Sequence, residues 1–290
     1  MFFSRLIVFL MALGLLSACA LQRQLEPENA HDSVPTDAST ALLEQAEACL
    51  NQADSAERLY ECRDQYHSVL KLNQGDYLAL AKLSTIYTLI GTAYTERRSA
   101  KSDTFELAMD YAEQAMLSNA EFRSLAQAGI PLWEAAEVLG ESEVEAMFYW
   151  VTALQYAFQE GMSLPQRIIN VRWLSNALLV LEHIEKMAPD FGGGSVKFGK
   201  AICYLVLPES FGGSKTQGQQ MIREAVDENP GWLLPRWGRA KYYYEIMNEP
   251  ESRQRELDWV ASQDPSDFHD LYPWRVHFVA DAREILRKLQ

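Results

Sequence analysis

Apolar residues recur at helical spacing through nearly the whole chain after residue 40, and the alternation typical of a half-buried strand is absent. Short connections marked by Gly or Pro separate the periodic stretches. The pattern predicts helices at roughly residues 41–51, 55–72, 76–98, 103–119, 121–128, 131–140, 143–160, 165–187, 193–207, 215–228, 232–247, 250–263 and 276–289. We therefore expect an all-α protein whose residues 41–290 form one helical domain.

The stretch Asp190–Pro230 is the most informative part of the sequence. It predicts two antiparallel helices, and Pro208 ends the first of them because proline disfavours helical backbone at the preceding residue. A small residue in each helix, then an apolar residue and a closing proline, are typical of a tetratricopeptide hairpin. Four residues fill those places: Gly199, Gly218, Ile222 and Pro230.

The connection inside this hairpin is longer than the repeat requires. Gly199 and Gly218 are 19 residues apart, whereas an ordinary repeat needs about a dozen within its 34-residue period. The surplus is the loop Pro208–Ser214. Either it is a helix stop followed by a flexible linker, or Phe211 and the glycines beside it give it a packing or functional role. We favour the second interpretation because a bare linker would expose the Phe211 ring to water.

Other helix pairs carry weaker forms of the same pattern. Tyr87, Ile90, Gly91 and Tyr94 follow the spacing expected in the first helix of a repeat. The closing prolines Pro189, Pro230 and Pro265 are 41 and 35 residues apart. The sequence thus predicts an α-solenoid or helical bundle of degenerate tetratricopeptide-like hairpins with lengthened helices.

The residues of Asp190–Tyr244 resemble the T component family of tripartite ATP-independent periplasmic (TRAP) transporters. The family pattern has a Gly-Gly before the first helix, a Gly within it, a Pro-Glu-x-x-Gly-Gly after it and a later Ala-Lys-Tyr-Tyr. Here these are Gly193, Gly194, Gly199, Pro208, Glu209, Gly212, Gly213 and Ala240–Tyr243. Ser214 departs from the acidic residue that the family often has.

The resemblance implies an α-helical solenoid that associates as a homotrimer and binds the transporter's solute-binding protein. It also implies a passage or crevice that holds a small apolar or organic-acid ligand, with no catalysis. The motif residues, together with Phe211, are then the candidate partner loop and are expected to be mainly architectural.

The N-terminus is typical of a bacterial lipoprotein. Arg5 precedes the apolar run Leu6–Leu16, which is too short to span a membrane, and Leu16-Ser17-Ala18-Cys19 resembles a lipobox. We expect residues 1–18 to be a signal peptide, Cys19 to be lipidated, and residues 19–40 to be a flexible tether. Ala20 in place of Asp points to an outer-membrane lipoprotein facing the periplasm.

The formal net charge of the chain is −14. Removal of the signal peptide, whose only charged residue is Arg5, takes it to −15. Such an acidic chain argues against nucleic acid as a partner and against charge-driven binding to an anionic membrane, so we expect the lipid alone to anchor it.

Three cysteines remain beside Cys19. Cys49 and Cys62 fall near the facing positions of the first hairpin, and an oxidising compartment permits a disulfide, but the sequence leaves this pairing open. Cys203 lies within an apolar helix, where a buried free thiol is expected.

No catalytic or metal-binding motif is present in the sequence. It has no G-x-S-x-G, H-E-x-x-H, phosphate loop or C-x-x-C, and its five histidines are scattered, as expected for surface or capping positions. We expect a non-enzymatic protein without metal or cofactor.

Aromatic residues concentrate on the later helices. Neighbours on a helix diverge by about 100°, so Phe148-Tyr149-Trp150 and Tyr242-Tyr243-Tyr244 cannot all face one core. Burial on both sides of a solenoid explains this, and so does a ligand passage or subunit contact. The candidate ligand-lining residues are Tyr149, Trp150, Trp173, Trp237, Tyr242, Tyr243 and Tyr244.

A second functional hypothesis remains open. An outer-membrane tetratricopeptide lipoprotein that scaffolds envelope or cell-wall assembly would explain the lipobox and the repeats equally well, but not the Pro208–Ser214 insertion.

Overall fold

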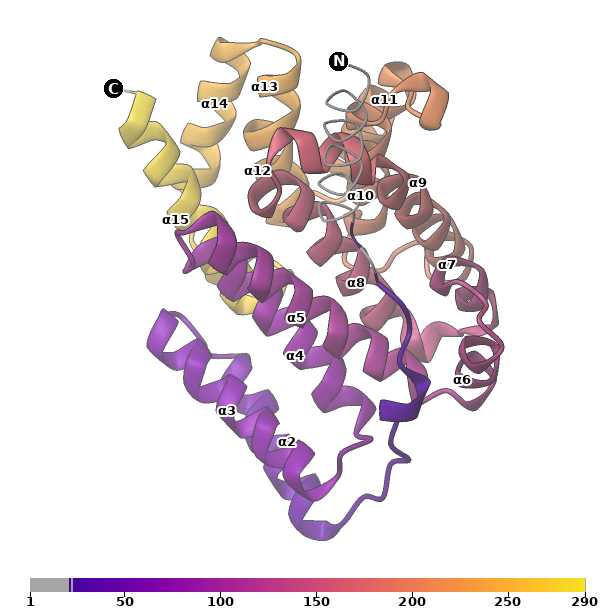
Figure 1. Ribbon diagram of the computed structural model, residues 1–290. Coiled ribbons are helices and arrows are strands. Elements are labelled where there is room, and N and C mark those ends of the chain that lie inside the picture. The colour runs from indigo at the N-terminus through magenta and orange to yellow at the C-terminus, as the bar shows by residue number, and fades with distance from the viewer. Residues whose placement is uncertain (1–20, 22, 290) are drawn as a thin grey trace, which may run out of the picture.

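The computed structural model describes residues 21 and 23–289, and every regular element among them is a helix (Figure 1). Successive helices pair as hairpins that stack side by side, so the prediction of an all-α solenoid or helical bundle is confirmed. The predicted signal peptide and the lipidation site Cys19 lie outside the described residues.

The first two hairpins are α2 with α3 and α4 with α5. Their bounds are Asp37–Leu50, Ala56–Leu72, Tyr77–Ala93 and Arg98–Leu117. The first three of these helices begin where the side chains of Thr36, Ser55 and Asp76 accept hydrogen bonds from free backbone N–H groups. A disulfide joins Cys49 of α2 to Cys62 of α3, which is the pairing that the sequence left open.

The middle of the chain centres on α8 (Val144–Tyr156) and α9 (Leu164–Met187), which pack against each other. The chain reaches α8 through short helices and 3-10 turns, namely α6 (Ala120–Gln127), α7 (Leu132–Ala135), Ala136–Val138 and Glu141–Glu143. A π-helical turn, Ala157–Gly161, continues α8 at its carboxyl end.

The remaining helices complete the array. Their bounds are α10 Ser195–Val206, α11 Lys215–Glu228, α12 Leu233–Gly238, α13 Tyr244–Ile246, α14 Pro250–Ala261 and α15 Tyr272–Leu289. The expected helix 232–247 is interrupted, because a π-helical segment, Arg239–Tyr243, separates α12 from α13. At the end of the chain α15 contacts α4, so the array curves back on itself (Figure 1).

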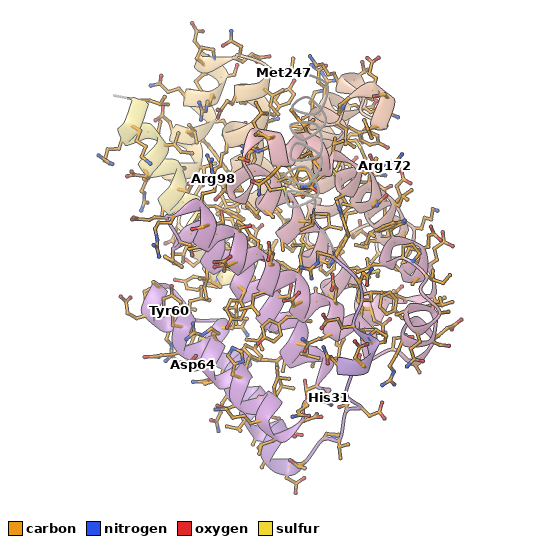
Figure 2. The ribbon with its side chains drawn as sticks, in the orientation of Figure 1. His31, Tyr60, Asp64, Arg98, Arg172 and Met247 are labelled. Atoms are coloured by element: carbon orange, nitrogen blue, oxygen red, sulfur yellow. A yellow bond between two sulfur atoms is a disulfide. The ribbon has the colours of Figure 1, made fainter. Side chains whose placement is uncertain are left out.

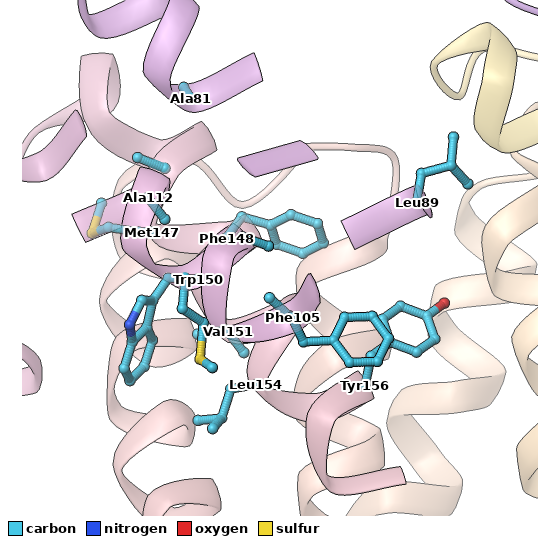
Figure 3. Close-up of a cluster of buried hydrophobic side chains, with 14 of the residues drawn as sticks. Ala81, Leu89, Phe105, Ala112, Met147, Phe148, Trp150, Val151, Leu154 and Tyr156 are labelled. Carbon is cyan, nitrogen blue, oxygen red and sulfur yellow. The ribbon is translucent and has the colours of Figure 1, made fainter. Parts of the chain in front are cut away.

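The core is dense where α8 crosses α5. Figure 3 shows Phe105 of α5 beside Tyr156 of α8, and their rings stack with centroids 5.8 Å apart. A Cβ at Gly91 of α4 would lie 2.4 Å from the Phe105 ring, so glycine is needed for this close approach. No helix in the described part of the chain is long and apolar enough to cross a membrane.

The described part of the expected tether, from residue 21 onward, packs against the helical body instead. Leu21 donates its N–H to Asn170 Oδ1 at 2.6 Å, and Arg23 forms ion pairs with Asp110 (2.6 Å) and Glu113 (3.0 Å) of α5. Helix α2 already begins at Asp37, before the expected end of the tether. The described part of this stretch thus makes contacts with distant residues that the tether prediction did not include.

Candidate functional site

A cavity of about 1040 Å³ lies between α8–α10 and the C-terminal helices. Aromatic and aliphatic side chains make up most of its wall, with a few polar and charged groups among them. Its size and lining are those of a small-molecule binding site.

One face of α8 forms the first wall. Phe148, Tyr149, Thr152 and Tyr156 line the cavity, and their spacing places them on the same side of the helix. Trp150 points elsewhere (Figure 3) and donates its Nε1–H to Glu113 at 2.8 Å in the core, so its assignment as a lining residue is wrong. Burial raises the pKa of the Tyr149 and Tyr156 hydroxyls, which stay protonated as hydrogen-bond donors.

The second wall includes the π-helical segment Arg239–Tyr243. Tyr242 lines the cavity, whereas Tyr243 packs with Phe198 in a separate apolar cluster, and Tyr244 lies beside the Tyr243 ring at 5.3 Å. Of the three tyrosines, only Tyr242 lines the cavity. Both π-helical segments of the described chain contribute to the wall, the other through Phe158 and Gln159, and such segments are frequent at functional sites.

Two further tryptophans lie outside the cavity. Trp237 is fully buried and donates its Nε1–H to Asp281 at 2.8 Å, so it belongs to the core. Trp173 faces a second, open hollow of about 610 Å³ on the other side of α9, where its ring meets Trp133 edge-on at 5.6 Å. Arg172, which is labelled in Figure 2, is exposed and borders this hollow.

The loop Pro208–Ser214 is an ordered turn, not a free linker. Glu209–Phe211 is a 3-10 turn, and Gly213 N–H donates to the Pro208 carbonyl at 3.0 Å. A Cβ on Gly213 would lie 1.8 Å from the Leu207 carbonyl oxygen, so the turn requires a glycine there. The Phe211 carbonyl accepts a hydrogen bond from Ser175 of α9 at 2.9 Å.

Phe211 thus separates the two hollows, because it lines both of them. Among the other motif residues, Gly199 and Pro208 also line the cavity. Glu209, Gly212 and Gly213 do not line it and instead form the turn.

The glycines before α10 shape the backbone. Gly192, Gly193 and Gly194 all have positive φ, a conformation that other residues adopt at a cost. The Trp232 ring lies directly against Gly193 and also lines the cavity, together with Gly192. This turn therefore links α10 to the segment that leads into α12.

Charged groups lie at separate points of the wall. Lys82 and Glu145 form an ion pair at 2.7 Å. Asp270 is 6% exposed and accepts hydrogen bonds from the N–H groups of Leu233 (2.7 Å) and Leu234 at the start of α12. Burial raises its pKa, although these N–H groups act in the opposite direction.

Arg167 is the remaining cation on the wall. It donates to the carbonyls of Gln159 (2.6 Å) and Met162 (3.2 Å), and to no carboxylate of the described residues. Its charge is therefore available to an anionic group of a ligand. Within the part of the chain that the structure describes, no cluster of His, Cys, Asp or Glu is arranged to hold a metal ion.

Sequence reasoning missed several wall residues. Phe148 stands in an aromatic triplet already noted, but no role was predicted for the other missed residues, which are Gln155, Tyr156, Arg167, Trp232 and Asp270. The histidines were also misjudged in one case, because His277 is buried at 7% exposure and is neither a surface nor a capping residue.

Comparison of the sequence with protein-family models gives no match, and comparison with curated proteins gives none either. The resemblance to the TRAP transporter T component thus depends on the residues of Asp190–Tyr244 alone.

Proposed function

We propose that this protein is a lipid-anchored, periplasm-facing accessory component of a TRAP-type transport system. In this role it binds the solute-binding protein and holds a small apolar or organic-acid ligand in the cavity. It performs no chemistry on the ligand, needs no cofactor, and works as a homotrimer in the outer membrane. Lipidation at Cys19 supplies the anchor.

The observation that carries the proposal is the position of the family-like motif at the cavity. Gly199 and Pro208 of the motif, and Phe211 within its loop, line a space large enough for a small organic molecule. The aromatic wall suits the body of an apolar ligand, and Arg167 suits a carboxylate on it.

The partner site is proposed at the outer side of the turn. Glu209 and Ser210 are exposed, while Phe211 behind them is fixed by Ser175 and by packing. An exposed polar turn on a rigid base is a common form of recognition site.

A scaffold for envelope or cell-wall assembly is the second candidate function. The hollow between Trp133, Trp173 and Phe211 favours it, since an open groove with aromatic side chains suits an extended peptide.

Ligand binding is tested with a fluorescent fatty acid titrated into the purified mature protein. Thr152→Trp fills the cavity from α8 and is expected to abolish the fluorescence increase, whereas Leu179→Trp, on an exposed site of α9 away from the cavity, is expected to leave it intact. Equal binding by both variants, with unchanged circular dichroism, would place the ligand elsewhere.

Partner binding is tested by capture from the periplasmic extract of the source organism, followed by mass spectrometry. We expect an extracytoplasmic solute-binding protein, lost in Glu209→Lys/Ser210→Arg but retained in Glu251→Lys, an exposed charge reversal on α14. Recovery of assembly factors or cell-wall enzymes without a solute-binding protein would favour the scaffold.

A further inference from the structure

The mouth of the cavity is bordered by exposed aliphatic side chains. Leu164 (69% exposed) and Ile168 (66%) project from α9, Val206 (44%) from α10 and Ile246 (42%) from α13. All four line the cavity, and they account for four of the nine large apolar side chains that are exposed in the described residues. We call this set the rim. Exposed apolar groups gathered at one site mark an interaction surface.

The N-terminal segment meets the body on α9, the helix that carries Leu164 and Ile168 of the rim. The N–H of Leu21 bonds to Asn170, two residues after Ile168, so the side chains of Ile168 and Asn170 leave α9 on different faces. Arg23 fixes the same segment, because its side chain is 10% exposed and bridges Asp110 and Glu113. Cys19 precedes Leu21 by two residues, which span at most about 7 Å when fully extended.

We propose that the rim is a membrane-contact surface that places the mouth of the cavity on the bilayer to which Cys19 is anchored. The inference rests on the lipidation included in the proposed function. Because the connection from Cys19 to Leu21 is this short, acyl chains inserted in a bilayer bring the N-terminal half of α9 to the membrane surface.

The chemistry of the rim fits lipid better than a protein partner. Its members are Leu, Ile and Val, without the Tyr and Trp that dominate the centres of protein interfaces. Arg167 lines the cavity with them. It donates to two backbone carbonyls but to no carboxylate of the described residues, so its positive charge can pair with lipid phosphate. An apolar ligand then exchanges between bilayer and cavity without crossing water.

The test measures contact of single sites with lipid. Cys49 and Cys62 form a disulfide and Cys203 is buried, so a cysteine introduced on the surface is labelled selectively. Ile168→Cys and the control Leu179→Cys, which is exposed on the same helix but away from the cavity, each receive an environment-sensitive fluorophore. The lipidated proteins are reconstituted in phosphatidylethanolamine–phosphatidylglycerol vesicles that contain nitroxide-labelled acyl chains.

We expect nitroxide quenching at position 168 and little at position 179. Equal quenching at the two sites, or none at either, would overturn the proposed orientation. A Gly-Ser linker inserted after Ala20 leaves the Arg23 contacts in place and is expected to reduce quenching at position 168 while vesicle binding persists. Unchanged quenching at position 168 after the insertion would show that the short connection between Cys19 and Leu21 does not position the rim.

Lipidation of Cys19, on which the inference depends, is checked separately by mass spectrometry of the mature N-terminus. Absence of acyl chains on Cys19 would overturn the inference through its premise and also remove the anchor from the proposed function. Acyl chains present without quenching at position 168 would overturn the orientation alone and leave the transport proposal standing.

Discussion

Trp232 lies so close to Gly193 that a Cβ on this glycine would be 2.1 Å from the indole ring. The contact joins the turn before α10 to the segment before α12, two stretches that border the cavity. Gly193 also has φ of +52°, so both its backbone conformation and its lack of a side chain are needed.

Gly193→Ala is therefore expected to destabilise the protein more than Gly212→Ala. Both residues have positive φ, which costs a non-glycine residue about 1–2 kcal/mol, but a Cβ on Gly212 would have nothing within 4 Å. Urea unfolding of the two variants measures the difference. Equal free energies of unfolding would mean that Trp232 moves aside without cost.

Much of the fold follows from local patterns in the sequence. The predicted helix 215–228 coincides with α11, because Ser214 caps its start and its apolar stripe faces α10. The helix end predicted from Pro208 is close to Val206, the last residue of α10 in the structure. Local chemistry of this kind needs no knowledge of the rest of the chain.

The cavity was less predictable because it depends on contacts between distant residues. A periodicity of 3.6 does not reveal the π-helical segment that places Tyr242 at the cavity and Tyr243 in the cluster around Phe198. The packing of Arg23 likewise depends on Glu113, which is 90 residues away. Divergence within each aromatic triplet was foreseen, but not which member would face the cavity.

Arg23→Ala is expected to destabilise the protein by about 3 kcal/mol, since removing one partner of a buried ion pair leaves an uncompensated charge. Here that charge is Glu113, whose side chain is 11% exposed and retains only Trp150 as a described hydrogen-bond donor. Arg123→Ala breaks the pair with Asp32, whose side chain is 80% exposed, and should cost less than ~1 kcal/mol. Thermal unfolding of both variants provides the measurement, and similar losses would contradict the assigned burial.

Reduction of the Cys49–Cys62 disulfide is expected to loosen the first hairpin. The two cysteines are 13 residues apart, and a loop of this size contributes about 3 kcal/mol. Hydrogen exchange of Cys49→Ala/Cys62→Ala should show faster exchange in α2 and α3 than in α10 and α11. An even increase over all helices would mean that the chain unfolds as one unit, with no local role for the disulfide.

The Cys203 thiol is expected to resist alkylation in the native protein. Burial raises its pKa to about 12, although a hydrogen bond from Gln155 Nε2 to its sulfur (3.2 Å) acts in the opposite direction. Little thiolate therefore forms at neutral pH. Maleimide labelling, counted by mass spectrometry, should add nothing until denaturant is present. Ile168→Cys, which is exposed, serves as the positive control. Rapid labelling of the native wild-type protein would argue against a closed wall at α10.

His277 is enclosed by Trp237, Trp274 and Phe278, with ring centroids 5.7–5.9 Å away. Burial is the main cause that lowers its pKa to about 4. Lys241 and Lys101 act in the same direction, while Asp281 opposes them. The folded protein therefore holds this imidazole neutral at pH values where the unfolded chain, with a pKa of about 6.5, already binds a proton.

Stability from this residue is thus fully present above about pH 6.5 and is lost as the pH falls toward 4. Between pH 7 and pH 5 the loss amounts to about 2 kcal/mol. Urea unfolding at both pH values measures it, and His277→Gln should remove this part of the pH dependence whatever its effect on stability at pH 7. If wild type and His277→Gln lose stability equally between the two pH values, the imidazole already binds a proton in the folded protein, and Asp281 then outweighs the aromatic enclosure.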